Sequence, residues 1–97
     1  MSEPVAAIIR FDGDPEDLLE RFERARRRWV DAQDAGQSPP VLYAACKSDT
    51  GIAILTGWET RAAHRAFAHQ IGPHLQAAGI GRPDHLEHLS IETLGCA

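Results

Sequence analysis

The chain has 97 residues, of which 43% are hydrophobic and 25% are charged. This length allows one domain, and the composition is that of an ordinary globular protein rather than a disordered or membrane-embedded chain. The formal net charge of -4 argues against a nucleic-acid-binding surface, which needs a concentrated excess of Lys and Arg. We therefore expect a single domain over residues 1–97, with neither nucleic acid nor a membrane as its partner.

The cysteines and the N-terminal residues indicate the compartment. Cys46 and Cys96 stand in no metal-binding or redox spacing, so free thiols in a reducing compartment are expected. The chain carries Glu3 early and has no long apolar run before Arg10, so neither a signal peptide nor a membrane span is predicted. We expect a cytoplasmic protein.

A strand and a helix are predicted in the first third of the chain. The run Val5 to Phe11 is almost entirely apolar and ends at Asp12-Gly13, a pattern typical of a strand buried on both faces and followed by a turn. Asp14 and Pro15 then provide a cap and a first-turn residue for a helix. Its apolar positions recur at helical spacing and predict one buried stripe: Leu18, Phe22, Ala25 and Trp29.

The middle of the chain predicts a β-hairpin. Residues 41–47 and 52–58 are apolar runs joined by the polar loop 48–51. We expect Gly51 to supply the positive φ of the hairpin turn.

A second helix and a last strand are predicted after the hairpin. Thr60 can cap a helix whose apolar positions fall about every four residues: Ala63, Phe67, Ile71, Leu75 and Ala78. Because Pro cannot donate to the preceding turn, Gly72-Pro73 predicts a kink or two abutting helical pieces. Residues 79–83 close this region, and residues 86–94 form the last strand.

This order predicts a ferredoxin-like βαββαβ fold of the α+β class, a four-stranded antiparallel sheet with both helices on one face. Both alternating sets of side chains in the strands are apolar, as in the first strand, where Val5 and Ala7 alternate with Ala6 and Ile8. A sheet apolar on both faces needs a second cover. We expect a homodimer through the helix-free sheet face, because a second copy is the simplest cover.

Residues 45–60, the helix after them, Gly72-Pro73 and Ala78-Gly79 together resemble the dimeric α+β barrel superfamily, and within it the small antibiotic-biosynthesis-monooxygenase-like proteins. The resemblance implies a homodimer of two facing sheets, with a ligand cavity between each sheet and its own helices. It also implies a range of activities: cofactor-independent oxygenation of aromatic polyketides, haem degradation, cyclisation, isomerisation and ligand-dependent regulation.

Histidines are the main candidates for chemistry. At about 100° per residue, His64 and His74 lie beside the buried stripe of the second helix and His69 lies on its far side. His74 follows the predicted helix break, so it is the first candidate for proton transfer. A hydrogen-bonded histidine at the edge of the core is the alternative. His64 is predicted to contact substrate, and His69 to be solvated.

Aromatic and hydroxyl side chains complete the predicted pocket. Tyr43 is the second candidate for proton transfer, because its hydroxyl could donate to a carbonyl or phenolate. Thr56 and Trp58 share one face of their strand and, with Phe67, are predicted to contact substrate. For Trp58 and Phe67 the alternative is an ordinary place in the core.

No metal or cofactor is expected. His64, His69 and His74 are each five residues apart, which turns successive side chains away from one another on a helix, so zinc binding is not predicted. The haem-degrading branch would place a histidine near Ala77 and a polar amide on the first strand, and the chain has neither. Haem is therefore kept only as a minority alternative.

The sequence thus predicts a small enzyme that acts on an aromatic or polyketide-like metabolite as a cofactor-independent monooxygenase, cyclase or isomerase. Its ligand is expected to be small and apolar or aromatic. A non-catalytic binding or sensing module, or a dimeric protein-interaction module, is the alternative.

Overall fold

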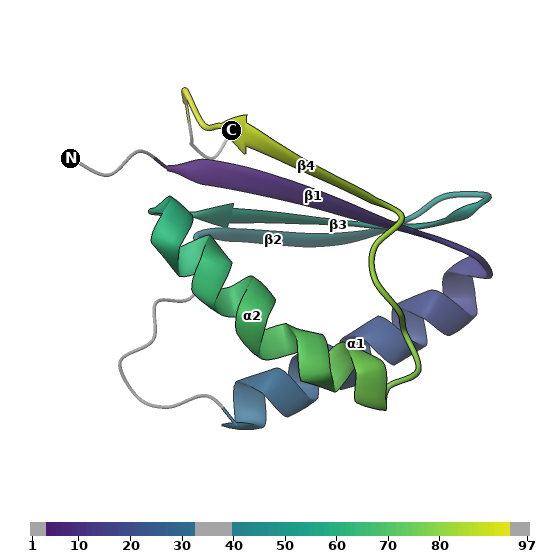
Figure 1. The fold of residues 1–97 in the computed structure, drawn as a ribbon. Helices are drawn as coiled ribbons and strands as arrows, with labels where there is room; N and C mark the ends of the chain where they lie inside the picture. The colour runs from purple at the N-terminus through teal and green to yellow at the C-terminus, as the bar shows by residue number, and fades with distance from the viewer. Residues whose placement is uncertain (1–3, 33–39, 94–97) are drawn as a thin grey trace.

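The computed structural model describes residues 4–32 and 40–93. Along the chain lie β1 (Val5–Asp12), α1 (Pro15–Ala32), β2 (Leu42–Lys47), β3 (Gly51–Trp58), α2 (Arg61–Ala77) and β4 (His85–Ser90). The strands form one antiparallel sheet in the order β2-β3-β1-β4. Both helices cover the same face of this sheet (Figure 1). The predicted ferredoxin-like α+β fold is confirmed.

Helix α1 begins and packs as its sequence predicts. The Asp14 carboxylate accepts a hydrogen bond from the Asp17 backbone N–H at 3.0 Å, which caps the first turn. The buried positions of the helix are Phe22, Ala25 and Trp29. The stripe predicted from spacing is therefore the face that meets the sheet and α2.

The hairpin between β2 and β3 is present, but Gly51 serves a different purpose from the one predicted. The Ser48 N–H donates to the Gly51 carbonyl at 2.9 Å and closes the loop. Among the described residues, positive φ occurs at Gly13 and Gly79, so the prediction for Gly51 is wrong. The backbone of β1 explains the glycine, because a Cβ at this position would collide with the Phe11 carbonyl oxygen.

Helix α2 runs unbroken through Gly72 and Pro73, so the alternative of two abutting pieces is wrong, and the alternative of a kink stays a prediction. An internal proline removes one backbone hydrogen bond and costs about 3 kcal/mol. Burial of Phe67 before the proline and Leu75 after it outweighs that cost, because both side chains belong to one core.

The last strand ends earlier than predicted. Strand β4 stops at Ser90, which pairs with Val5, the first residue of β1. Beyond Ser90 the Ile91 N–H donates to the Pro4 carbonyl at 3.1 Å, but Pro4 has no backbone N–H to return a bond to Ile91. The predicted end, Leu94, lies outside the described residues.

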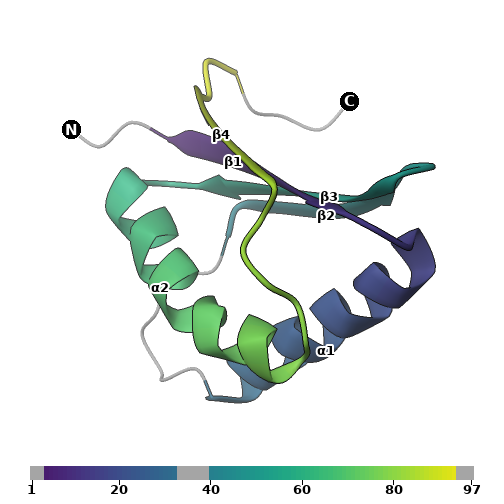
Figure 2. The same ribbon diagram turned by 45° about the vertical axis from the view of Figure 1, so that its right-hand side comes forward.

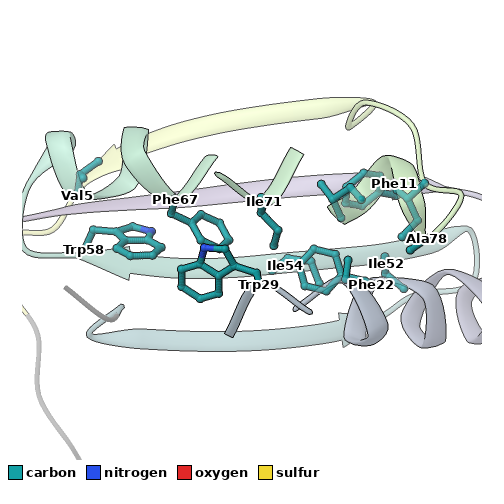
Figure 3. Packing of buried hydrophobic residues seen from close by; sticks show 13 residues of the cluster. Val5, Phe11, Phe22, Trp29, Ile52, Ile54, Trp58, Phe67, Ile71 and Ala78 are labelled. Carbon is teal, nitrogen blue, oxygen red and sulfur yellow. The ribbon is translucent and has the colours of Figure 1, made fainter. Parts of the chain in front are cut away.

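The core between sheet and helices has two ends (Figure 3). At one end the Phe67 ring centroid lies 4.9 Å from those of both Trp29 and Trp58. At the other end Phe11 of β1 packs against Phe22 of α1, with ring centroids 6.2 Å apart. Both helices thus attach to the sheet through aromatic contacts.

The opposite face of the sheet carries no described helix (Figure 2). Its side chains follow from strand alternation and the pairing register. The apolar ones, which we call the free face, are Ala6, Ile8, Leu42, Ala44, Ala53, Leu55 and Leu89. None of the described helices is long and apolar enough to cross a membrane.

Candidate functional site

A large cavity lies between α2, the β1 and β4 side of the sheet, and the connection from α2 to β4. Its volume is about 730 Å³, which is within the usual range for small-molecule sites. Its apolar lining includes Ile9, Phe67, Ile71, Leu75, Ile80 and Leu86. Its polar lining consists of Thr56, His64, His69, Gln76 and Arg82. We call this space the main cavity.

Packing of the two helices leaves room for the main cavity on one flank of α2. Helix α1 packs against the other flank, where the Trp29 indole N–H donates to the Gln70 side chain at 3.1 Å. Small residues face the cavity from α2, notably Ala68 and Gly72. A Cβ added at Gly72 would meet no atom within 4 Å.

His64 is the buried titratable group of the main cavity. Its side chain comes from the first turns of α2, and its residue is 8% exposed. The ring centroid lies 5.0 Å from that of His88 and 6.0 Å from that of Trp58. Burial, and to a lesser extent the nearby His88, lowers the pKa of His64 below its ordinary value of 6.5. His64 is therefore a neutral imidazole at physiological pH.

The sheet presents a row of three residues on the side of His64. Ala7 of β1 pairs with Thr56 of β3 on one side and with His88 of β4 on the other. The Thr56 hydroxyl accepts a hydrogen bond from the Trp58 indole N–H at 2.9 Å, and both side chains are buried. A hydroxyl and two imidazoles thus gather at this end of the main cavity.

A smaller cavity of about 310 Å³ lies on the α1 and β2 side of the core. It shares Thr56 and Phe67 with the main cavity, and Trp58 and Tyr43 also line it. Four of the side chains predicted to form one pocket therefore border this smaller space.

Tyr43 is held by α1. Its hydroxyl donates to the Glu23 carboxylate at 2.7 Å, and the Arg26 guanidinium lies 4.9 Å from the centre of its ring. Burial and the Glu23 carboxylate raise the pKa of Tyr43 well above its ordinary value of 10.0. Tyr43 is thus a neutral phenol with a partner already in place. The structure does not bring it to the main cavity, and its catalytic role stays a prediction.

His74 also lies away from the main cavity. It is not among the described residues that line that space. Gln70 and His74 are four residues apart and so share one flank of the helix, and Gln70 reaches α1 through Trp29. Because α2 is uninterrupted, the direction of His74 around the helix axis follows from the residues before it. A break at Gly72-Pro73 would have allowed His74 to point elsewhere. The catalytic role of His74 stays a prediction.

Three polar residues of the main cavity escaped the sequence analysis: His69, Gln76 and Arg82. His69 was predicted to be solvated, and it is exposed, but it also borders the cavity mouth. Helical spacing shows which face of α2 is buried, but not which flank α1 leaves open. For Arg82, in the connection to β4, the sequence carries no corresponding signal.

No described group of three or more His, Cys, Asp or Glu side chains is placed to hold a metal ion. Cys46, predicted to be free, has no disulfide partner among the described residues and is exposed at the end of β2. Cys96 lies outside the described residues.

Neither a protein-family model nor a curated protein sequence matches the chain. Solved structures do match over nearly its whole length. SnoaB, a cofactor-independent oxygenase from Streptomyces nogalater, is 19% identical with a TM-score of 0.63, over 98% of this chain and 97% of that one. A protein of unknown function from Nitrosomonas europaea is 16% identical with a TM-score of 0.69, over 99% and 96%.

A protein from Caulobacter crescentus, provisionally named an antibiotic biosynthesis monooxygenase, gives a TM-score of 0.63 at 14% identity, over 95% of this chain and 92% of that one. The chain has the fold of the antibiotic-biosynthesis-monooxygenase-like proteins. The resemblance found in the sequence is thereby confirmed for the fold. At these identities the likeness shows the fold and assigns no activity.

Proposed function

We propose that the protein binds a small apolar or aromatic metabolite in the main cavity and acts on it as a cofactor-independent monooxygenase, cyclase or isomerase. The observation that carries the proposal is a buried, neutral His64 in the wall of an otherwise largely apolar cavity. The fold shared with SnoaB, which is described as a cofactor-independent oxygenase, supports the same proposal.

Removal of a substrate proton is a first step open to all three reaction classes. A neutral imidazole can accept that proton, and an apolar surrounding strengthens polar contacts with the anion that forms. Thr56 is held by Trp58 near this base and offers a polar contact for a substrate oxygen. The exposed His88 beside His64 offers a path by which the proton can leave to solvent.

A binding or sensing module is the second candidate. Apart from His64, the described lining holds no buried titratable group, and it contains neither a cysteine nor a carboxylate. Such a lining would suffice for recognition without turnover.

The test is a panel of hydroxylated aromatic ketones, with binding followed by fluorescence and turnover by oxygen uptake and product mass spectrometry. Replacing His64→Gln should leave binding within about threefold and lower kcat by about 100-fold or more, the usual contribution of a general base. The His85→Gln variant changes an exposed histidine of β4 that does not line the main cavity, so it is the matched control and should keep its kcat.

The other outcomes separate the candidate functions. Ligand binding without turnover in the unchanged protein would favour the sensing module. Full activity in the His64→Gln variant would overturn the assignment of the base. Binding of no compound in the panel would contradict the proposal.

We also propose that the protein is a homodimer through the free face. That side of the sheet carries apolar side chains on all four strands, alongside the polar residues Arg10, His85 and Glu87, and no described segment of the chain forms a second layer over it (Figures 1 and 2). Burying it against a second copy would remove this apolar surface from water.

A further inference from the structure

On the basis of the proposed ligand cavity, we infer that its ligand is a monoanion, with an apolar body seated in the main cavity and an acidic group bound by Arg82 at the rim. Carboxylates, sulfonates and acidic phenols have this chemistry. The inference follows from the charge of the cavity lining and adds the charge of the ligand to the proposed function.

Among the described residues, the lining of the main cavity includes no acidic side chain, although the chain as a whole has 14 Asp and Glu against 10 Lys and Arg. Its ionisable members are Arg82, His69 and His64. Arg82 is always charged, whereas burial keeps His64 neutral. The cavity therefore presents one fixed positive charge to a bound molecule.

Arg82 has no carboxylate partner among the described residues. By contrast, Arg21, Arg24 and Arg26 of α1 each form an ion pair with an acid on the same helix. The acid nearest to Arg82 in sequence, Asp84, is engaged elsewhere, because its carboxylate accepts the Asp12 backbone N–H at 2.7 Å. The Arg82 guanidinium is thus free to form charge-assisted hydrogen bonds with a ligand.

Two further donors lie on the same flank of α2. His69 and Gln76 are seven residues apart, close to two helical turns, and both line the main cavity. The apolar side chains deeper in the cavity, among them Ile71 and Leu75, can take only an apolar body. Donors at the rim and an apolar interior match an amphipathic acid better than a neutral hydrocarbon.

Two fluorescent probes with the same ring system test the inference. 8-Anilinonaphthalene-1-sulfonate carries a negative charge, and N-phenyl-1-naphthylamine is neutral. Replacing Arg82→Gln should weaken binding of the sulfonate by about threefold to tenfold, as expected for a partly exposed charge-assisted contact, and leave the neutral probe within about twofold. Added salt should weaken only the sulfonate.

Control variants separate this inference from the cavity on which it rests. Arg27→Gln removes an exposed arginine of α1 outside the main cavity and should change neither Kd. Gly72→Leu places a side chain in the open space of the main cavity, so both probes should lose binding.

The two kinds of failure are distinguishable. If Gly72→Leu abolishes binding of both probes but Arg82→Gln affects them equally or not at all, the cavity stands and the anion inference is overturned. If both probes still bind the folded Gly72→Leu variant with unchanged Kd, the main cavity is not their site and the proposed function loses its support.

Discussion

At the scale of single residues, His64 is a titratable group held in largely apolar surroundings. It lies against two aromatic side chains, Trp58 and Phe67, and beside a second imidazole, His88. Protonation would place a charge in this apolar surrounding and next to a second titratable ring. The same features that keep His64 neutral for proton transfer therefore make its protonated form unfavourable in the folded state.

This predicts a pH dependence of stability. The pKa of His64 is 6.5 when unfolded and lower when folded, so between the two values the unfolded chain binds more protons. The contribution of neutral His64 to stability is fully present above about pH 6.5. As pH decreases from there through the folded pKa, the free energy of unfolding falls. Urea unfolding between pH 8 and pH 5 should show the fall, and the His64→Gln variant should reduce it. If His69→Gln reduced it equally, His64 would not be the source.

For single residues, the sequence predicts which side chains are buried, but not which partner or cavity each side chain faces. Spacing along α2 places Phe67 in the buried stripe and His64 beside it, and the structure buries both residues. The partner of Tyr43 is Glu23, twenty positions away in sequence. That contact depends on how α1 lies across β2, which a sequence pattern does not specify. In the same way, the position of Arg82 at the main cavity depends on the path of the connection from α2 to β4, which a sequence pattern does not specify.

At the scale of elements, the end of α2 forms one edge of the main cavity. The Ile80 N–H donates to the Leu75 carbonyl at 2.9 Å and the Gly79 N–H to the Gln76 carbonyl at 3.0 Å, the two bonds of a Schellman motif. Gly79 has a φ of 83°, which turns the chain back toward β4. Because Leu75 and Ile80 both line the cavity, this motif fixes part of its wall.

Replacing Gly79→Ala should lower the free energy of unfolding by about 1–2 kcal/mol, the cost of a left-handed conformation for an L-residue. The added Cβ would also meet the Arg21 guanidinium, which donates to the Ala78 carbonyl at 3.3 Å. Urea denaturation measures the loss. Gly81→Ala is the matched control, because its Cβ would meet no atom within 4 Å and its φ is not positive; its change should stay within about 0.5 kcal/mol. Equal losses in both variants would contradict the conformational explanation.

The order of the elements could be read from the sequence because each has a local signal: a capping residue, a stripe or a hairpin loop. The errors occur where a tertiary contact overrides such a signal. Pro73 does not divide α2, since the packed face of the helix continues past it, and β4 stops at Ser90 because the next partner, Pro4, has no backbone N–H to donate.

At the scale of the whole molecule, the sheet has two different faces. The helices cover one face and lie over the core, whereas the free face has no second layer in the described chain (Figure 1). The main cavity and the smaller cavity at Tyr43 are both on the helix side. Alternation in the strands could predict that both faces are apolar. It could not predict the main cavity, which arises from the angle between α2 and the sheet.

The proposed homodimer gives the last prediction. Leu55 lies near the middle of the free face, between Ile8 of β1 and Ala44 of β2, and points away from the helix-side core. Replacing Leu55→Glu would place facing carboxylates in the interface, so sedimentation at micromolar concentration should change from a dimer to a monomer. Circular dichroism should show that the variant keeps its secondary structure.

The matched control is Val30→Glu, the same kind of change at an exposed valine of α1, which should leave the dimer intact. Should Leu55→Glu fail to fold, Leu89→Glu repeats the test at a more exposed position of the free face. If the unchanged protein is a monomer, the proposed dimer does not form. If the dimer persists with a charge on the free face, the free face is not its interface.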